Sequence, residues 1–146
     1  MIKLSRLTDY GMLILAQMAE NPERLFTSTE LAGDTRIAAT TVSKLLKVLA
    51  TNGILLSFRG KQGGYRLAKR PADIQLTSII EAFEGPMAMT ECAKANSHCG
   101  IEGHCTTKHH WQRINQVITE ALSTLSLSDI TAKTLNKRPM IHGELP

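Results

Sequence analysis

In the first 19 residues, apolar side chains recur among polar ones with the period of an α-helix. Between residues 4 and 19 the apolar positions recur at spacings of three and four, as one buried helix face requires. These positions are Leu7, Ile14, Leu15 and Met18, with small Gly11 between them. Asn21 and Pro22 end the pattern, so we expect a helix over residues 4–19.

Two further helices are expected between residues 27 and 52. Thr27 and Glu30 have the spacing of a capping box, which predicts a helix start at Thr27, with Leu31 and Ala32 facing the core. After residues 34–37 the pattern restarts at Ala38, and the third helix has one apolar face. That face consists of Val42, Leu45, Leu46 and Leu49. Asn52 and Gly53 end the helix.

A basic, glycine-rich segment separates two short β-prone runs, residues 54–58 and 65–67. The segment reads Arg59-Gly60-Lys61-Gln62-Gly63-Gly64. This arrangement predicts a β-hairpin with a basic tip. The order helix, helix, turn, helix and hairpin predicts a mostly α fold: a winged helix-turn-helix DNA-binding domain with a small β-hairpin wing.

The second half of the chain predicts a connector, a cysteine loop and a long helix. Thr77 is expected to cap a short helix that ends at Gly85. From about residue 108 to 127 an apolar stripe recurs with helical spacing: Trp111, Ile114, Ile118, Ala121, Leu122 and Leu125. Since the first domain already has a core, this stripe indicates a long C-terminal dimerisation helix. We therefore divide the chain into a DNA-binding domain (1–70), a connector helix and cysteine loop (71–107), a dimerisation helix (108–130) and a mobile tail (131–146).

Charge is unevenly distributed along the chain. Residues 1–70 hold 11 Lys and Arg and 5 Asp and Glu, a net charge of +6, whereas residues 71–146 hold 6 and 8, a net charge of −2. A basic first part indicates a polyanionic partner, here a double-stranded DNA operator. The chain has neither a run of 18 apolar residues nor a signal-peptide pattern, so we expect a cytoplasmic protein without a membrane partner.

The start of the third helix and the wing contain the candidate DNA-binding residues. In a helix-turn-helix, the first residues of the second helix of the motif reach base edges, and other side chains hold phosphates. The helical candidates are Ser28, Ala38, Ala39, Thr40, Thr41, Ser43 and Lys44, and those of the wing are Arg59, Lys61, Tyr65 and Arg66. For Tyr65, cross-strand packing is favoured over base contact. Helix and wing together favour DNA binding over a merely solvated polar surface.

Three cysteines, Cys92, Cys99 and Cys105, fall in one short stretch. An odd number of cysteines in a cytosolic chain indicates metal or redox chemistry rather than a disulfide framework. Their wide spacing favours an iron-sulfur cluster, while a zinc site and a thiol switch remain open. A fourth ligand would be a histidine, a carboxylate or an exogenous molecule. Cys105 and His109 could form a nucleophilic pair, but no oxyanion hole or substrate pocket is indicated, so we expect no enzyme.

Several of these segments resemble one family across residues 1–130. The matching segments are Leu7-Thr8-Asp9-Tyr10-Gly11, residues 37–49, residues 59–67 and the three cysteines. The chain is similar to the bacterial iron-sulfur regulators of the IscR/NsrR type, and residues 2–11 look most like the branch that regulates the SUF iron-sulfur assembly operon.

The resemblance implies a homodimer held by the long C-terminal helix, with a 2Fe-2S or 4Fe-4S cluster on the three cysteines. The family's fourth ligand is either a histidine shortly after the last cysteine or an acidic residue of the partner's first helix. Lys108 occupies the usual histidine position, so the partner's Asp9 is the first candidate and His109 the second. The implied function is control of iron-sulfur assembly genes according to cluster status. The alternatives are a nitric-oxide-sensing repressor of the same family and a zinc-stapled DNA-binding module.

Overall fold

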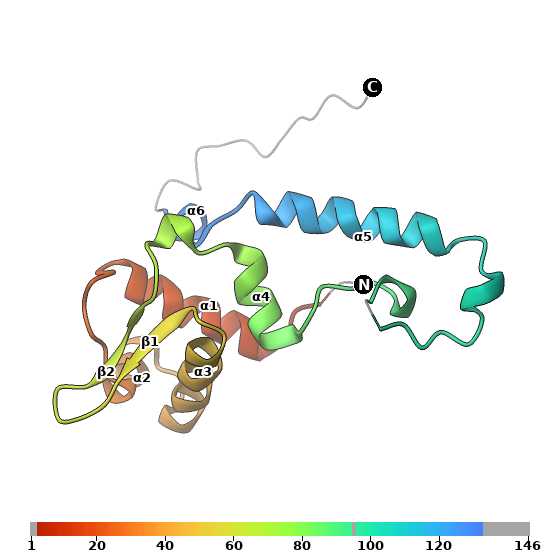
Figure 1. Ribbon diagram of the computed structural model, residues 1–146. Helices are drawn as coiled ribbons and strands as arrows, with labels where there is room; N and C mark the ends of the chain where they lie inside the picture. Colours follow the sequence, from red (N-terminus) through yellow and green to blue (C-terminus); the bar gives the residue numbers. More distant parts are fainter. Residues whose placement is uncertain (1–2, 95, 133–146) are drawn as a thin grey trace.

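The chain folds into six α-helices, three short 3-10 helices and one two-stranded hairpin within residues 3–94 and 96–132, the part that this computed structural model describes (Figure 1). In chain order the elements are α1 (Arg6–Ala19), α2 (Ser28–Thr35), α3 (Ala39–Thr51), β1 (Leu55–Phe58), β2 (Gly64–Leu67), η1 (Pro71–Asp73), α4 (Leu76–Glu84), η2 (Glu91–Ala93), η3 (Glu102–His104), α5 (Lys108–Ser123) and α6 (Leu127–Thr131). The expected fold class, mostly α with a winged helix-turn-helix, is confirmed.

The helix-turn-helix is built from α1, α2 and α3, which pack against one another. The capping box at the start of α2 is confirmed, because the Glu30 N–H donates to Thr27 Oγ1 (3.2 Å) and the Thr27 N–H donates to Glu30 Oε2 (3.4 Å). The apolar faces of the second and third helices are also confirmed. Their buried side chains are Leu31, Val42, Leu45, Leu46 and Leu49.

One expected core position of the first helix is wrong. Leu7 is 50% exposed, whereas its neighbour Thr8 is fully buried. The reason is that α4 packs against the first turn of α1, where the Thr8 hydroxyl donates to the Glu84 carboxylate. The helix also begins later than expected, at Arg6, because the Ser5 side chain caps it by accepting from the Thr8 N–H (3.3 Å).

The wing is the expected antiparallel hairpin. Leu55 lies opposite Leu67 and Phe58 lies opposite Gly64. Phe26 extends the pairing, since it exchanges two backbone hydrogen bonds of 2.8 Å with Tyr65. A side chain at Gly64 would place Cβ 2.5 Å from the Phe26 carbonyl oxygen, so only glycine allows this close approach.

The connector helix α4 ends at Gly85 as expected, but Thr77 does not cap it. The helix begins at Leu76, and Thr77 lies buried within its first turn. No side chain caps this helix start. Instead, the Leu76 N–H donates to the Leu125 carbonyl (2.9 Å), so a distant backbone segment satisfies it.

The single helix expected over residues 108–130 is wrong, because the structure divides it into α5 and α6. Ser126 and Asp129 form a second capping box that opens α6. Leu127 is fully buried in the core of the DNA-binding domain, and its N–H donates to the Ile74 carbonyl (2.8 Å). The chain thus returns to α1 after α5, so α6 belongs with the DNA-binding domain. Most of the predicted tail, residues 133–146, lies outside the described residues.

Candidate DNA interface and cysteine loop

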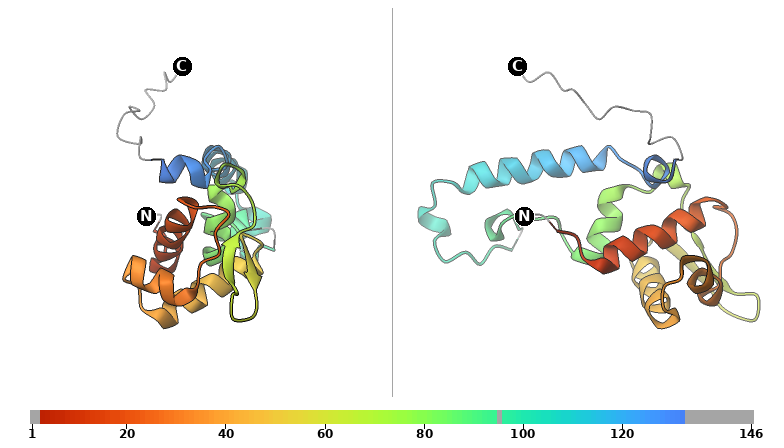
Figure 2. Two further views of the ribbon diagram at one scale, coloured as in Figure 1. Left: turned by 90° about the vertical axis from the view of Figure 1, so that its left-hand side faces the viewer. Right: turned by 180° about the vertical axis from the view of Figure 1, so that it is seen from behind.

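The start of α3 and the wing tip lie on the same side of the molecule, away from α5 (Figures 1 and 2). Thr40 and Lys44 are exposed on α3, and Thr41 and Ser43 are partly buried. Ala38 and Ala39 are exposed at the helix start. Since the opposite face of α3 is packed in the core, the helix start presents a rigid row of short polar side chains together with Lys44.

Two basic residues in this region were not among the sequence candidates. Lys47 is exposed one helical turn after Ser43, on the same face of α3 as Lys44. Arg36 is exposed in the turn between α2 and α3 and has a left-handed backbone conformation (φ 59°). Helical spacing alone would have found Lys47. The unusual conformation of Arg36 depends on how the two helices join, which no local pattern predicts.

The wing residues divide into a free tip and a supported base. Arg59 and Lys61 are exposed at the tip. At the base, the Arg66 guanidinium lies over the Phe58 ring (5.4 Å to its centre), and its Nη1 is 3.9 Å from the Glu23 carboxylate. Tyr65 is half-buried and packs against the core, which agrees with the packing interpretation.

Ser28 is the first residue of α2 and is partly buried. It lies in the helix before the turn, where a helix-turn-helix contacts the DNA backbone rather than bases.

The three cysteines occupy the loop between α4 and α5, and all are free and partly buried. Cys92 lies in η2, and Cys105 lies between η3 and α5. Each of these two sulfurs is close to a threonine hydroxyl: Cys92 Sγ is 3.2 Å from Thr90 Oγ1, and Cys105 Sγ is 3.4 Å from Thr107 Oγ1. The hydrogen bond to the Thr107 side chain lowers the pKa of the Cys105 thiol, and the Thr107 backbone adds to this effect.

The donor types of this loop fit an iron-sulfur cluster, because three free thiols come from one short segment. Among residues 3–94 and 96–132, no three His, Cys, Asp or Glu side chains lie close enough together to hold a metal ion. Asp9 is exposed on α1, and His109 is exposed in the first turn of α5. The described part of a single chain therefore contains candidate metal ligands but does not bring three of them together in this conformation.

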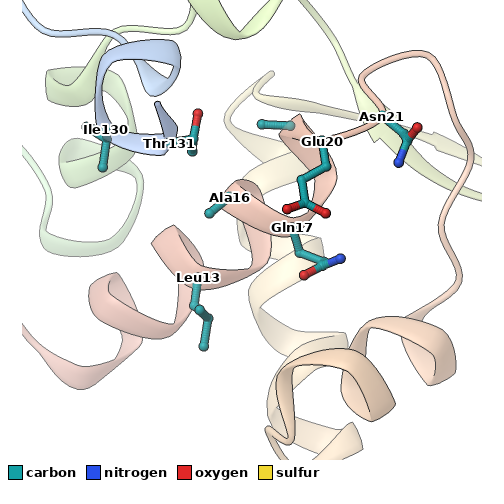
Figure 3. A pocket seen from close by; sticks show the side chains of 8 residues that line it. Leu13, Ala16, Gln17, Glu20, Asn21, Ile130 and Thr131 are labelled. Atoms are coloured by element: carbon teal, nitrogen blue, oxygen red, sulfur yellow. The ribbon is translucent and has the colours of Figure 1, made fainter. Parts of the chain in front are cut away.

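Several hollows lie beside α1, and two of them are large. The first, about 850 Å³, is open and lies between α1 and α6 (Figure 3). Its polar lining comes from Gln17, Glu20, Asn21 and Thr131, which contain no nucleophile paired with a base. The second, about 690 Å³, is mainly apolar and lies where α1, α4 and α5 meet. In the part of the chain that is described, no helix is long and apolar enough to cross a membrane.

An exposed helix start beside a basic wing defines a winged helix-turn-helix DNA-binding protein. The model of the Rrf2 family, iron-dependent transcriptional regulators, matches residues 4–133. The chain belongs to this family. It is also 32% identical over 136 residues to a protein of Azotobacter vinelandii named as an HTH-type transcriptional regulator, covering 88% of this chain and 80% of that protein.

Solved structures agree with this assignment. IscR of T. potens is 27% identical, with a TM-score of 0.64, and the match covers 88% of this chain and 85% of that one. CymR, the global cysteine regulator of B. subtilis, has the same fold, with a TM-score of 0.68, 24% identity and coverage of 92% of this chain and 99% of that one. The expectation of a transcriptional regulator is therefore confirmed at the level of the family, whose members bind DNA and commonly dimerise.

Proposed function

We propose that this protein is a homodimeric regulator whose operator binding depends on an iron-sulfur cluster held by Cys92, Cys99 and Cys105. The observation that carries the proposal is the set of three free, partly buried thiols on one loop that leads directly into α5. The chain's family is described as iron-dependent, and one structural relative is an IscR. We also propose that it controls iron-sulfur assembly genes, as in the SUF branch, and this part rests on the resemblance of residues 2–11 alone.

On the DNA side, we assign base contacts to α3 and backbone contacts to the wing. Thr40, Ser43 and Lys44 present short hydroxyls and one ammonium, which suit base edges in the major groove. Arg59 and Lys61 are exposed at a narrow tip, where they would neutralise phosphates or enter the minor groove.

The second copy of the chain would cover α5. No residue of this helix is buried, and Ile114 and Val117 are 41% and 48% exposed. Trp111 is 39% exposed in the same helix. An apolar helix face of this kind requires a partner surface. A dimer around α5 would present two α3 helices to successive major grooves, about 34 Å apart.

The cluster would be held by the three cysteines and one further ligand, the partner's Asp9 or, as the second choice, His109. When bound, a cluster supplies a cross-link of the loop that is sensitive to iron supply and oxidation. The Thr90 and Thr107 hydroxyls lie beside Cys92 and Cys105, where they would donate hydrogen bonds to thiolate sulfur. Gathering the thiols requires the loop between η2 and η3 to close.

The first experiment measures iron, sulfide and zinc per chain, together with the visible absorption spectrum, after anaerobic purification. We expect equal iron and sulfide in the wild type, their loss in Cys99→Ser, and their retention in the control Thr106→Ala, whose side chain is exposed on the same loop. Zinc without sulfide would refute the cluster and favour the zinc-stapled module.

Operator binding is then measured for the cluster-loaded and cluster-free protein. We expect different affinities, and Cys99→Ser should behave as the cluster-free form. Equal affinities would refute the sensing function. A response to nitric oxide, without any response to iron removal, would favour the nitric-oxide-sensing repressor instead.

The fourth ligand is tested with Asp9→Asn and His109→Ala. If the partner's Asp9 is a ligand, Asp9→Asn loses the cluster to a chelator faster than the wild type, whereas His109→Ala does not. The reverse order would assign the role to His109.

A further inference from the structure

Residues 84–89, which we call the strap, connect α4 to the cysteine loop. Figure 1 shows this segment leaving the end of α4 beside α1 and running towards the loop below α5. Side-chain hydrogen bonds attach its first residue to α1 and its last residues to α5. The strap is thus joined both to the DNA-binding domain and to the helix that follows the cysteines.

The first attachment is made by Glu84. Its Oε1 accepts from the Ser5 N–H (2.8 Å) and from the Thr8 hydroxyl, and Ser5 and Thr8 belong to the N-terminal turn of α1. These hydrogen bonds lower the pKa of the Glu84 carboxyl, with the Thr8 hydroxyl as the main cause. A carboxylate at a helix N-terminus is also favoured by the helix dipole. Glu84 therefore fixes the strap to the turn of α1 that leads into Asp9.

The second attachment is made by Asn115 of α5. Its Oδ1 accepts from the Met89 N–H (3.0 Å), and its Nδ2 donates to the Met87 carbonyl (3.1 Å). One side chain thereby satisfies two backbone groups of the strap. Gln112, one turn earlier on α5, places its Nε2 3.5 Å from the Cys92 carbonyl and extends the contact to the first cysteine. The strap therefore ends in a fixed position on α5, shortly before Cys92.

We propose that the strap is the link through which the state of the cysteine loop reaches α1 and the DNA-reading elements, with Glu84 and Asn115 as its positioning residues. This inference rests on the proposed function. α1 packs against α2, α3 and β2, so a shift of its first turn moves the surface that carries the reading helix and the wing. Because the two attachments lie in series, loss of either one should interrupt this route from the loop to α1, although α4 still packs against α1.

The test compares operator affinity with and without the cluster, expressed as a ratio for each variant. For a wild-type ratio of about tenfold, a typical coupling, Glu84→Ala and Asn115→Ala should each bring the ratio close to one. The double variant should show no further loss. Glu84→Gln keeps an acceptor oxygen for Ser5 and Thr8 and should retain the wild-type ratio. Glu81→Ala is the matched control, since Glu81 is exposed on the same helix and makes no side-chain hydrogen bond within the described residues.

A second readout uses the cluster-free protein. Hydrogen exchange at the Ser5 amide should increase in Glu84→Ala, and exchange at the Met89 amide should increase in Asn115→Ala. If Glu84→Ala does not fold, Thr8→Val replaces it, because valine keeps the buried volume and removes the hydroxyl donor.

Two results would overturn the inference, and they are distinguishable. A tenfold wild-type ratio that persists in both alanine variants would refute the strap as the link and leave the proposed function intact. A wild-type ratio of one, in protein shown to contain iron and sulfide, would refute the sensing function and the link together.

Discussion

Replacing Gly11 by alanine tests how tightly α1 and α4 are packed. Gly11 is buried in α1, and a Cβ atom there would lie 2.4 Å from both Cε2 and Cζ of the Phe83 ring. Alanine gains about 1 kcal/mol of helix propensity over glycine. Overpacking a core costs about 1–3 kcal/mol. The difference is a net loss of about 0–2 kcal/mol in the free energy of unfolding, and we expect its upper part because the added Cβ would meet two ring atoms at 2.4 Å.

The assay is urea unfolding at one protein concentration, since dimerisation makes apparent stability concentration-dependent. Gly33→Ala is the matched control, because Gly33 lies in α2 and its added Cβ would meet nothing within 4 Å. This control should be more stable than the wild type by about 0.5–1 kcal/mol. In a Phe83→Leu background, which lacks the outer ring atoms, Gly11→Ala should become neutral or stabilising.

Stabilisation by Gly11→Ala as large as that by Gly33→Ala would contradict this prediction. That result would mean that the ring moves aside without cost, so α4 would not be held tightly against α1. The same result would count against the strap as the link between the loop and α1, because the Glu84 attachment depends on the same contact between α1 and α4.

Three further predictions concern other parts of the molecule. Leu127→Ala should lower the free energy of unfolding by about 2–5 kcal/mol in the same assay, because Leu127 is fully buried in the core. Arg59→Ala and Lys61→Ala should each reduce the slope of log affinity against log salt, measured by operator titrations, by about 0.9 for every phosphate that the wild-type side chain neutralises. Since the pKa of Glu84 is lowered in the folded state, its stabilising effect is present above about pH 4.3 and is lost as pH falls through the lowered value. Unfolding measured against pH should show less acid sensitivity in Glu84→Gln.

Local patterns predicted the DNA-binding domain well because its helices have strongly periodic apolar faces and local caps. The face of α3 is fully buried, and the capping box at Thr27 forms as expected. The basic, glycine-rich segment predicted the wing for a similar reason. One of its glycines meets a local requirement, because a Cβ atom at Gly63 would lie 2.2 Å from the Phe58 carbonyl oxygen within the same hairpin.

The errors concern residues whose environment is set by distant segments. Thr8 is buried instead of Leu7 because Glu84, which is 76 residues away, accepts a hydrogen bond from it. The start of α4 needs no side-chain cap because Leu125 supplies a carbonyl. The division between α5 and α6 was accessible to sequence reasoning, since Ser126 and Asp129 have the spacing of a capping box.

The candidate site was predictable in its residue types and less so in its geometry. Helical spacing placed Thr40 and Lys44 on the exposed face of α3, where the structure has them. The cysteines lie in one short segment of the sequence, but under the proposed function their assembly around one centre would depend on loop closure and on a second chain. Neither follows from spacing within a single chain.

The attachments of α5 determine how a change in the cysteine loop would act on the rest of the molecule. At its C-terminal end, α5 is followed by α6, whose Leu127 is buried against the core, so this end is fixed to the DNA-binding domain. Towards its N-terminal end, α5 contacts η2 and the strap, and these belong to the loop itself. Closure of the loop should therefore move the N-terminal end of α5 most, and Asn115 lies at the point where that movement would pass into the strap. Since the exposed apolar side chains Trp111 and Ile114 lie in the same half of the helix, the dimer contact would change together with the loop.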